Sequence, residues 1–181
     1  MLAEYYIEEN DFLDYQLYTA SKSSLIRKKR LRNKVLVPVV YLAFGLLFIY
    51  LQNNITAVMF SAVGVLWFFL YPLWERNRYV SYYRKYIREN HKERFGRKVS
   101  IRFEKDYIYT HDNGNEGKIS TYEIEEINDI PKLILLKLKT GQSLIIPKNK
   151  IADLNDLIAG LKEQAVALKV RFNTEPEWKW K

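Results

Sequence analysis

The feature that most constrains this chain is a stretch of forty residues without a single charge, from Val35 to Trp74. One helical crossing of a bilayer's hydrocarbon core takes about 20 apolar residues. Three polar residues, Gln52, Asn53 and Asn54, interrupt the stretch near its middle. We therefore predict an integral membrane protein with an antiparallel transmembrane hairpin, formed by residues 35–51 and 55–74.

Basic residues gather on both sides of this stretch. Residues 27–34 hold six basic residues and no acid, and residues 75–98 hold nine basic residues against three acids. Basic segments beside membrane spans stay in the cytoplasm, so we predict a multi-pass protein with both termini cytoplasmic. A nucleic-acid patch is the weaker interpretation of the same charge. The residues predicted to set the topology and to contact anionic lipid are Arg27, Lys28, Lys29, Arg30, Arg32, Lys34, Arg76, Arg78, Arg84 and Lys85.

The predicted spans contain no ionisable residue, which disfavours a transporter or a pump, because such residues usually mark proton and substrate paths. Ala57, Ser61 and Gly64 form a ridge of small residues along the second span. Such a ridge lets a neighbouring helix come close. The first span is the favoured neighbour, because the connection is short, and a second subunit is the alternative. Asn54 is expected to cap the second span.

Two further segments flank the hairpin. The N-terminal segment, residues 1–34, is predicted to hold a short strand, an amphipathic helix capped by Asn10, and the basic run. The connector, residues 75–98, is predicted to be a helix that ends at Gly96. It either continues the second span into the cytoplasm, which we favour, or lies in the lipid headgroups. Its predicted packing face consists of Tyr79, Tyr82, Tyr83 and Tyr86.

Residues 99–181 alternate in the manner of antiparallel strands. Asn113-Gly114 and Thr140-Gly141-Gln142 are typical hairpin turns. A one-sided apolar stripe after Asn149, the expected cap, predicts a final helix that covers a sheet. We therefore expect a small cytoplasmic α+β domain, with antiparallel strands followed by a C-terminal helix. The polar tail carries Trp178 and Trp180, which we expect to be exposed and able to anchor at a surface.

Residues with catalytic potential are scarce. The chain has no cysteine, and its two histidines, His91 and His111, are isolated from acids at ligand spacing. Neither a glycine-rich phosphate loop nor a nucleophile motif occurs in the sequence. We therefore predict a protein that is not an enzyme, with no catalytic residue, metal site or cofactor.

The order of these segments resembles the YcxB-like family of bacterial membrane proteins. The resemblance rests on the acidic-aromatic start EYYIEENDFLDYQLYTASKS, the basic run, two spans, the tyrosine-rich connector and the run LILLKLKTGQSLIIPK before a helix. Within that run, Ile146-Pro147-Lys148 is most similar to the family pattern. The resemblance implies an inner-membrane protein with a cytoplasmic domain similar to a pleckstrin-homology-like barrel. It carries no agreed activity and no catalytic residues.

The expected function is that of a membrane-anchored, non-enzymatic module. Its cytoplasmic domain would bind a protein partner or a lipid headgroup in a regulatory or scaffolding role, an inference by analogy of fold. The expected partners are a bilayer with anionic lipid at its cytoplasmic face and an unidentified protein, without nucleic acid. The alternative is a membrane-integral protein of the immunity type, which oligomerises or acts on another protein through its hairpin.

Overall fold

A computed structural model describes residues 1–112 and 114–180, without the side chain of residue 94. The chain divides into two compact units. Met1–Gln16 and Arg84–Lys179 form the β-rich unit, whereas Leu17–Tyr83 and Trp180 belong to the helical unit. Two long apolar helices therefore precede a region of antiparallel sheet and a helix near the C-terminus, as predicted.

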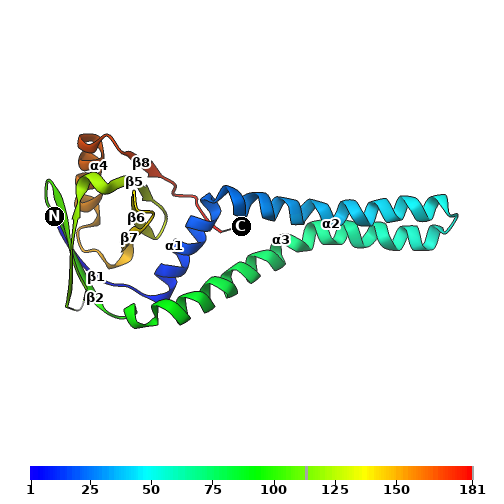
Figure 1. The fold of residues 1–181 in the computed structure, drawn as a ribbon, viewed down its shortest axis with the longest axis horizontal. Coiled ribbons are helices and arrows are strands. Elements are labelled where there is room, and N and C mark those ends of the chain that lie inside the picture. Colours follow the sequence, from blue (N-terminus) through cyan, green and yellow to red (C-terminus); the bar gives the residue numbers. More distant parts are fainter. Residues whose placement is uncertain (113, 181) are drawn as a thin grey trace. The chain divides into compact units, whose positions relative to one another are not determined.

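The helical unit is built on two long helices that run antiparallel and side by side from a tight turn (Figure 1). They are α2 (Ser24–Tyr50) and α3 (Asn54–His91). Gln52 adopts a φ of 61° in the turn. The residue that caps α3 is Asn53, whose side-chain oxygen accepts a hydrogen bond from Thr56 N at 3.2 Å. The prediction of Asn54 as the cap was wrong by one residue, because Asn54 is already helical.

Neither long helix stops at the end of its apolar stretch. The basic run 27–34 lies within α2, and the predicted connector continues α3 without a break past Pro72 to His91. The connector is thus a continuation of the second apolar helix, which is the alternative that the sequence favoured. Apolar runs alone could not show this, because the helix persists through residues that are mostly charged or aromatic.

Four antiparallel strands form the first sheet of the β-rich unit, in the order β1-β2-β3-β4. The strands are β1 (Leu2–Tyr6), β2 (Lys98–Phe103), β3 (Tyr107–Asp112) and β4 (Asn115–Ser120). Tyr5 pairs with Val99, so the first strand belongs to the same sheet as residues 98–120. The segment 1–34 is therefore divided between the two units, in contrast to the predicted boundary at residue 34. Of the predicted Asn113-Gly114 turn, Gly114 has a φ of 94° and Asn113 lies outside the described residues.

The second sheet has the order β7-β6-β5-β8. Its strands are β5 (Ile124–Asp129), β6 (Leu133–Leu138), β7 (Ser143–Pro147) and β8 (Arg171–Thr174). Strand β8 follows the helix of residues 154–168 and runs parallel to β5. β8 was not predicted from the sequence, since it is only four residues long and gains its stability from pairing with a distant strand.

One helix shares the apolar core with both sheets. This helix, α4 (Leu154–Leu168), contributes Leu157, Leu161 and Ala165 to a cluster of buried residues from both sheets. The predicted apolar stripe is therefore the packed face. The predicted cap Asn149 instead lies in the short 3-10 helix η3 (Lys148–Lys150), and Asp153 precedes the first turn of α4. Two other 3-10 turns are η1 (Lys92–Arg94) and η2 (Thr121–Glu123).

The N-terminal helix α1 (Glu9–Lys22) begins one turn after β1. Asp11 accepts a hydrogen bond from Glu8 N at 2.8 Å, so the carboxylate closes the first turn from inside the helix. The predicted cap Asn10 lies inside α1. Lys150 binds the same Asp11 at 2.9 Å and Glu8 at 3.0 Å, which fixes the start of α1 within the β-rich unit.

Candidate functional site

The outer surface of the α2–α3 hairpin is apolar and exposed. Leu46, Ile55 and Phe69 have 69%, 79% and 68% of their surface accessible, and most other large apolar side chains between Val35 and Trp74 are also exposed. Both helices are long and apolar enough to cross a membrane. A contiguous apolar surface of this kind marks an interaction site. The hairpin thus suggests association with a membrane.

The inner surface of the hairpin is made by small residues. A Cβ added to Gly64 would lie 3.2 Å from Tyr41 Cβ and 3.4 Å from Pro38 O, and one added to Gly45 would lie 2.6 Å from Ser61 Oγ. Ala57 is buried on the same face. The predicted ridge of Ala57, Ser61 and Gly64 therefore packs against the first apolar helix, the neighbour that the sequence favoured over a second subunit.

A partly buried ion pair lies at the end of the hairpin where the charge-free stretch stops. Arg30 Nε on α2 donates to Glu75 Oε2 on α3 at 2.9 Å, and Tyr71 OH donates to Glu75 Oε1 at 2.8 Å. Glu75 is only 4% exposed. The ion pair with Arg30 and the hydrogen bond from Tyr71 compensate for the burial of a carboxylate there. This role of Glu75 was not predicted, since nothing in the sequence reveals a partner 45 residues away.

The penultimate residue of the chain also belongs to this cluster. The guanidinium of Arg30 lies 4.6 Å from the ring centroid of Trp180 and 5.8 Å from that of Tyr79. Tyr79 and Trp180 meet edge to face, with ring centroids 5.4 Å apart. Trp180 is 7% exposed, so the prediction of an exposed tail tryptophan was wrong at this position. Its ring is buried because it covers a cation whose charge the aromatic face attracts.

The ten basic residues predicted to face the membrane surface have different environments. Arg30 is committed to the ion pair with Glu75, whereas Arg84 pairs with Glu9 at 3.4 Å and Lys85 with Glu89 at 3.8 Å. Two others lie over aromatic rings: Lys34 over Phe68 and Arg78 over Trp74, at 4.4 and 5.1 Å from the ring centroids. The remaining five side chains are exposed: Arg27, Lys28, Lys29, Arg32 and Arg76.

The tyrosine stripe of the connector is narrower than predicted. Tyr79 and Tyr83 are half-buried, and burial raises the pKa of both phenols. Tyr82 and Tyr86 are 63% and 40% exposed, so they do not form a packed face. Positions 79 and 83 are in line with Ile87, which is fully buried, whereas 82 and 86 lie on the flank of that face.

The two histidines lie in different parts of the β-rich unit. The ring of His91 stacks on Phe12, with centroids 5.1 Å apart and 13° between the planes. His111 is exposed on β3 and faces Glu116, with Nδ1 3.8 Å from Oε1. Among residues 1–112 and 114–180, no three histidine or acidic side chains are grouped as they would be around a metal ion.

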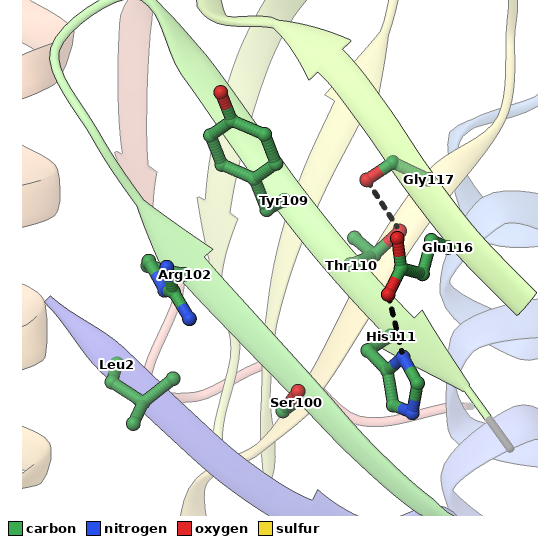
Figure 2. A pocket seen from close by; sticks show the side chains of 8 residues that line it. All are labelled: Leu2, Ser100, Arg102, Tyr109, Thr110, His111, Glu116 and Gly117. Carbon is green, nitrogen blue, oxygen red and sulfur yellow. Dashed lines mark hydrogen bonds and ion pairs between the residues drawn. The ribbon is translucent and has the colours of Figure 1, made fainter. Parts of the chain in front are cut away.

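A shallow hollow of about 330 Å³ lies on the first sheet, on the face that carries His111 (Figure 2). Arg102 and Ser100 on β2 and Tyr109 and His111 on β3 line it. This group was not predicted from the sequence. The only sequence signal is alternation, which places each of these side chains on the polar face of its strand.

No protein-family model matches the chain, and a search of curated proteins found no relative. The resemblance to the YcxB-like family stays a prediction from the sequence.

Proposed function

We propose that this chain is a multi-pass protein of the cell's inner membrane, anchored by the α2–α3 hairpin with both termini in the cytoplasm. The β-rich unit is then a non-enzymatic module that binds a protein partner or a lipid headgroup in a regulatory or scaffolding role. The observation that carries the proposal is the exposed apolar surface of the hairpin, because exposing so many large apolar side chains to water is costly.

Length and charge support lipid as the cover of this surface. Residues 35–51 and 55–74 span about 26 and 30 Å as helices, close to the thickness of a hydrocarbon core. The turn carries the polar but uncharged Gln52, Asn53 and Asn54, whereas the basic residues lie at the opposite end of both helices. Cationic ends stay on the cytoplasmic side, where they also attract anionic lipid.

The end of the hairpin opposite the turn carries residues that are typical of the boundary between membrane hydrocarbon and lipid headgroups. Tyr71 and Trp74 lie one turn apart on α3, and Lys34 and Arg78 cover neighbouring rings. Aromatic residues with adjacent cations are enriched where hydrocarbon meets headgroups. The buried Glu75 is compensated by Arg30, so the single acid there does not oppose insertion.

A binding role for the β-rich unit is supported by its construction. Its twenty acidic and nineteen basic residues nearly balance, and its two sheets and one helix share one core. His91 is stacked as a packing residue and His111 is an exposed rim residue. Two four-stranded sheets with one helix also support the proposed pleckstrin-homology-like character.

The alternative role, in which the hairpin oligomerises or acts on another membrane protein, loses the observation that suggested it. The ridge of Ala57, Ser61 and Gly64 is occupied by the first helix of the same hairpin. A partner helix would have to use the outer surface instead.

Alkaline carbonate extraction of cell membranes tests the anchor. The full chain should stay in the membrane pellet. Leu46→Glu places a charge on the outer surface and should shift a large fraction to the supernatant, because a carboxylate at the helix centre costs about 2.5–3.5 kcal/mol. Tyr122→Glu is the matched control, since Tyr122 is 65% exposed on the β-rich unit. Release of the unmodified chain by carbonate would refute the anchor.

A further inference from the structure

We propose that the outer face of the first sheet holds a binding site for a phosphomonoester, centred on Arg102. The inference deepens the proposed function by naming the ligand chemistry of the β-rich unit. The site rests on the proposed function only because it treats the β-rich unit as the part that binds. Binding of the phosphate does not require that the hairpin lies in a membrane. The phosphate group could belong to a lipid headgroup or to a soluble metabolite.

Cross-strand register places the polar side chains in two rows on this face. Arg102 pairs with Tyr109, and Tyr109 pairs with Lys118, which gives one row across β2, β3 and β4. Ser100 pairs with His111 in the neighbouring row. Figure 2 shows Arg102, Ser100 and His111 around the same depression, with Leu2 of β1 at its edge.

Arg102 is the unpaired cation of this group. Among the described residues it makes no hydrogen bond or ion pair through its guanidinium. Its neighbours on the same face are already paired: Lys98 binds Glu4 at 2.7 Å, and His111 faces Glu116 at 3.8 Å. A guanidinium presents a rigid fork of donors that fits two oxygens of a phosphate. An unpaired arginine in a polar hollow is therefore a candidate binding site for an anion.

The surrounding groups favour a doubly charged phosphate. The hydroxyls of Ser100 and Tyr109 are further donors on the same face. Lys118 lies one strand beyond Tyr109, with its ammonium 3.8 Å from the ring centroid of Tyr107 and 5.5 Å from that of Tyr109. Arg102 and Lys118 are thus the two cross-strand neighbours of Tyr109 on this face. A phosphomonoester carries nearly two charges at neutral pH, so it gains more from two cations than a phosphodiester or a carboxylate does.

Glu116 limits what the hollow accepts. Its carboxylate is turned toward His111 in Figure 2, at the rim opposite Arg102. The hollow therefore has a cationic side and a side that excludes negative charge. A ligand with one phosphate and a neutral remainder fits this polarity, and its volume of about 330 Å³ admits a small headgroup or metabolite.

Calorimetric titration of the full chain tests the site, in nanodiscs of zwitterionic lipid or, if carbonate releases the chain from membranes, in aqueous buffer. Glycerol 3-phosphate and inorganic phosphate are the soluble probes. To test a lipid headgroup as the ligand, vesicles are titrated into the chain in nanodiscs. One set of vesicles contains phosphatidic acid, which is a phosphomonoester, and the other contains phosphatidylglycerol, which is a phosphodiester. Both sets have the same surface charge. Binding of a soluble probe, or a preference for phosphatidic acid over phosphatidylglycerol, supports the site and identifies the source.

Variants separate the site from general charge attraction. Arg102→Gln should weaken monoester binding at least tenfold, and Arg102→Lys should weaken it less, because the charge remains but the fork is lost. Lys139→Gln removes the same charge from the exposed β6–β7 turn and should change binding less than twofold. Arg102 is exposed, so neither substitution threatens the fold.

Two outcomes would overturn the proposal: no binding of any monoester by the unmodified chain, or equal losses in Arg102→Gln and Lys139→Gln. Either would leave the carbonate extraction result unchanged. Conversely, a chain that carbonate releases from membranes can still bind glycerol 3-phosphate. The two proposals therefore fail independently.

Discussion

At the scale of single residues, Glu75 links the two long helices where they leave the apolar stretch. It accepts from Arg30 on one helix and from Tyr71 on its own. Both partners approach within 3 Å of a carboxylate that is almost fully buried. Loss of one member of such a group leaves the other buried and unpaired, which costs more than the contact itself contributes.

Glu75→Gln should therefore lower the free energy of unfolding of the helical unit by about 1–3 kcal/mol. The variant Arg30→Met should have a similar effect. The double variant should cost less than the sum of the two, because no unpaired charge remains. Thermal unfolding of the full chain in one detergent measures all three. Additive effects in the double variant would show that the two side chains do not interact.

Tyr5 makes the stability of the β-rich unit depend on alkaline pH. Burial, and then the nearby charges of Asp11 and Asp112, raise the pKa of its phenol far above the ordinary value of 10. Above pH 10 the unfolded chain releases this proton and the folded chain retains it. The free energy of unfolding should then fall by up to about 1.4 kcal/mol for each pH unit.

Tyr5→Phe should flatten this decline without abolishing it. Burial by itself lowers the pKa of Lys150, but the hydrogen bonds that its ammonium donates to Asp11 and Glu8 outweigh burial and raise the pKa. Lys150 therefore contributes with the same sign above about pH 10.4. Chemical denaturation at pH 8, 10 and 11, followed by circular dichroism, gives the slopes. An unchanged slope in Tyr5→Phe would contradict the assignment.

At the scale of elements, the hairpin is held by close backbone approach along the small-residue ridge. Gly64→Leu should push the helices apart and destabilise the hairpin by about 1–3 kcal/mol, because Tyr41 and the backbone of Pro38 leave no space for a side chain. Ala62→Leu is the matched control, since residue 62 faces outward. Unfolding in mixed micelles compares the two. Equal stability of both variants would show that the ridge does not form the helix interface.

Periodicity predicted the elements whose signals are local. The ridge, both apolar helices and the packed stripe of α4 follow from spacing alone. Helix caps were missed at Asn54 and Asn149 because several polar residues compete at each start, and backbone geometry selects among them. The tyrosine stripe was too broad because four residues that share one face by spacing still differ in depth.

At the scale of the whole molecule, long-range pairing decides what local signals cannot. The sequence predicted a separate N-terminal segment, but β1 joins β2 across nearly a hundred residues and brings Met1–Gln16 into the β-rich unit. The same limit applies to the candidate sites. Neither the pairing of Arg30 with Glu75 nor the group around Arg102 could be predicted, because each depends on residues from separate elements.

The central claim is that the hairpin crosses a membrane with both termini in the cytoplasm, and the chain's lack of cysteine allows a direct test. Asn54→Cys places one thiol at the start of α3, and Lys139→Cys places one in the β-rich unit. A membrane-impermeant maleimide is added to intact spheroplasts and, separately, to lysed ones. Labelling of Asn54→Cys in intact spheroplasts, with labelling of Lys139→Cys only after lysis, is the predicted result. Labelling of both thiols from the same side would contradict the account.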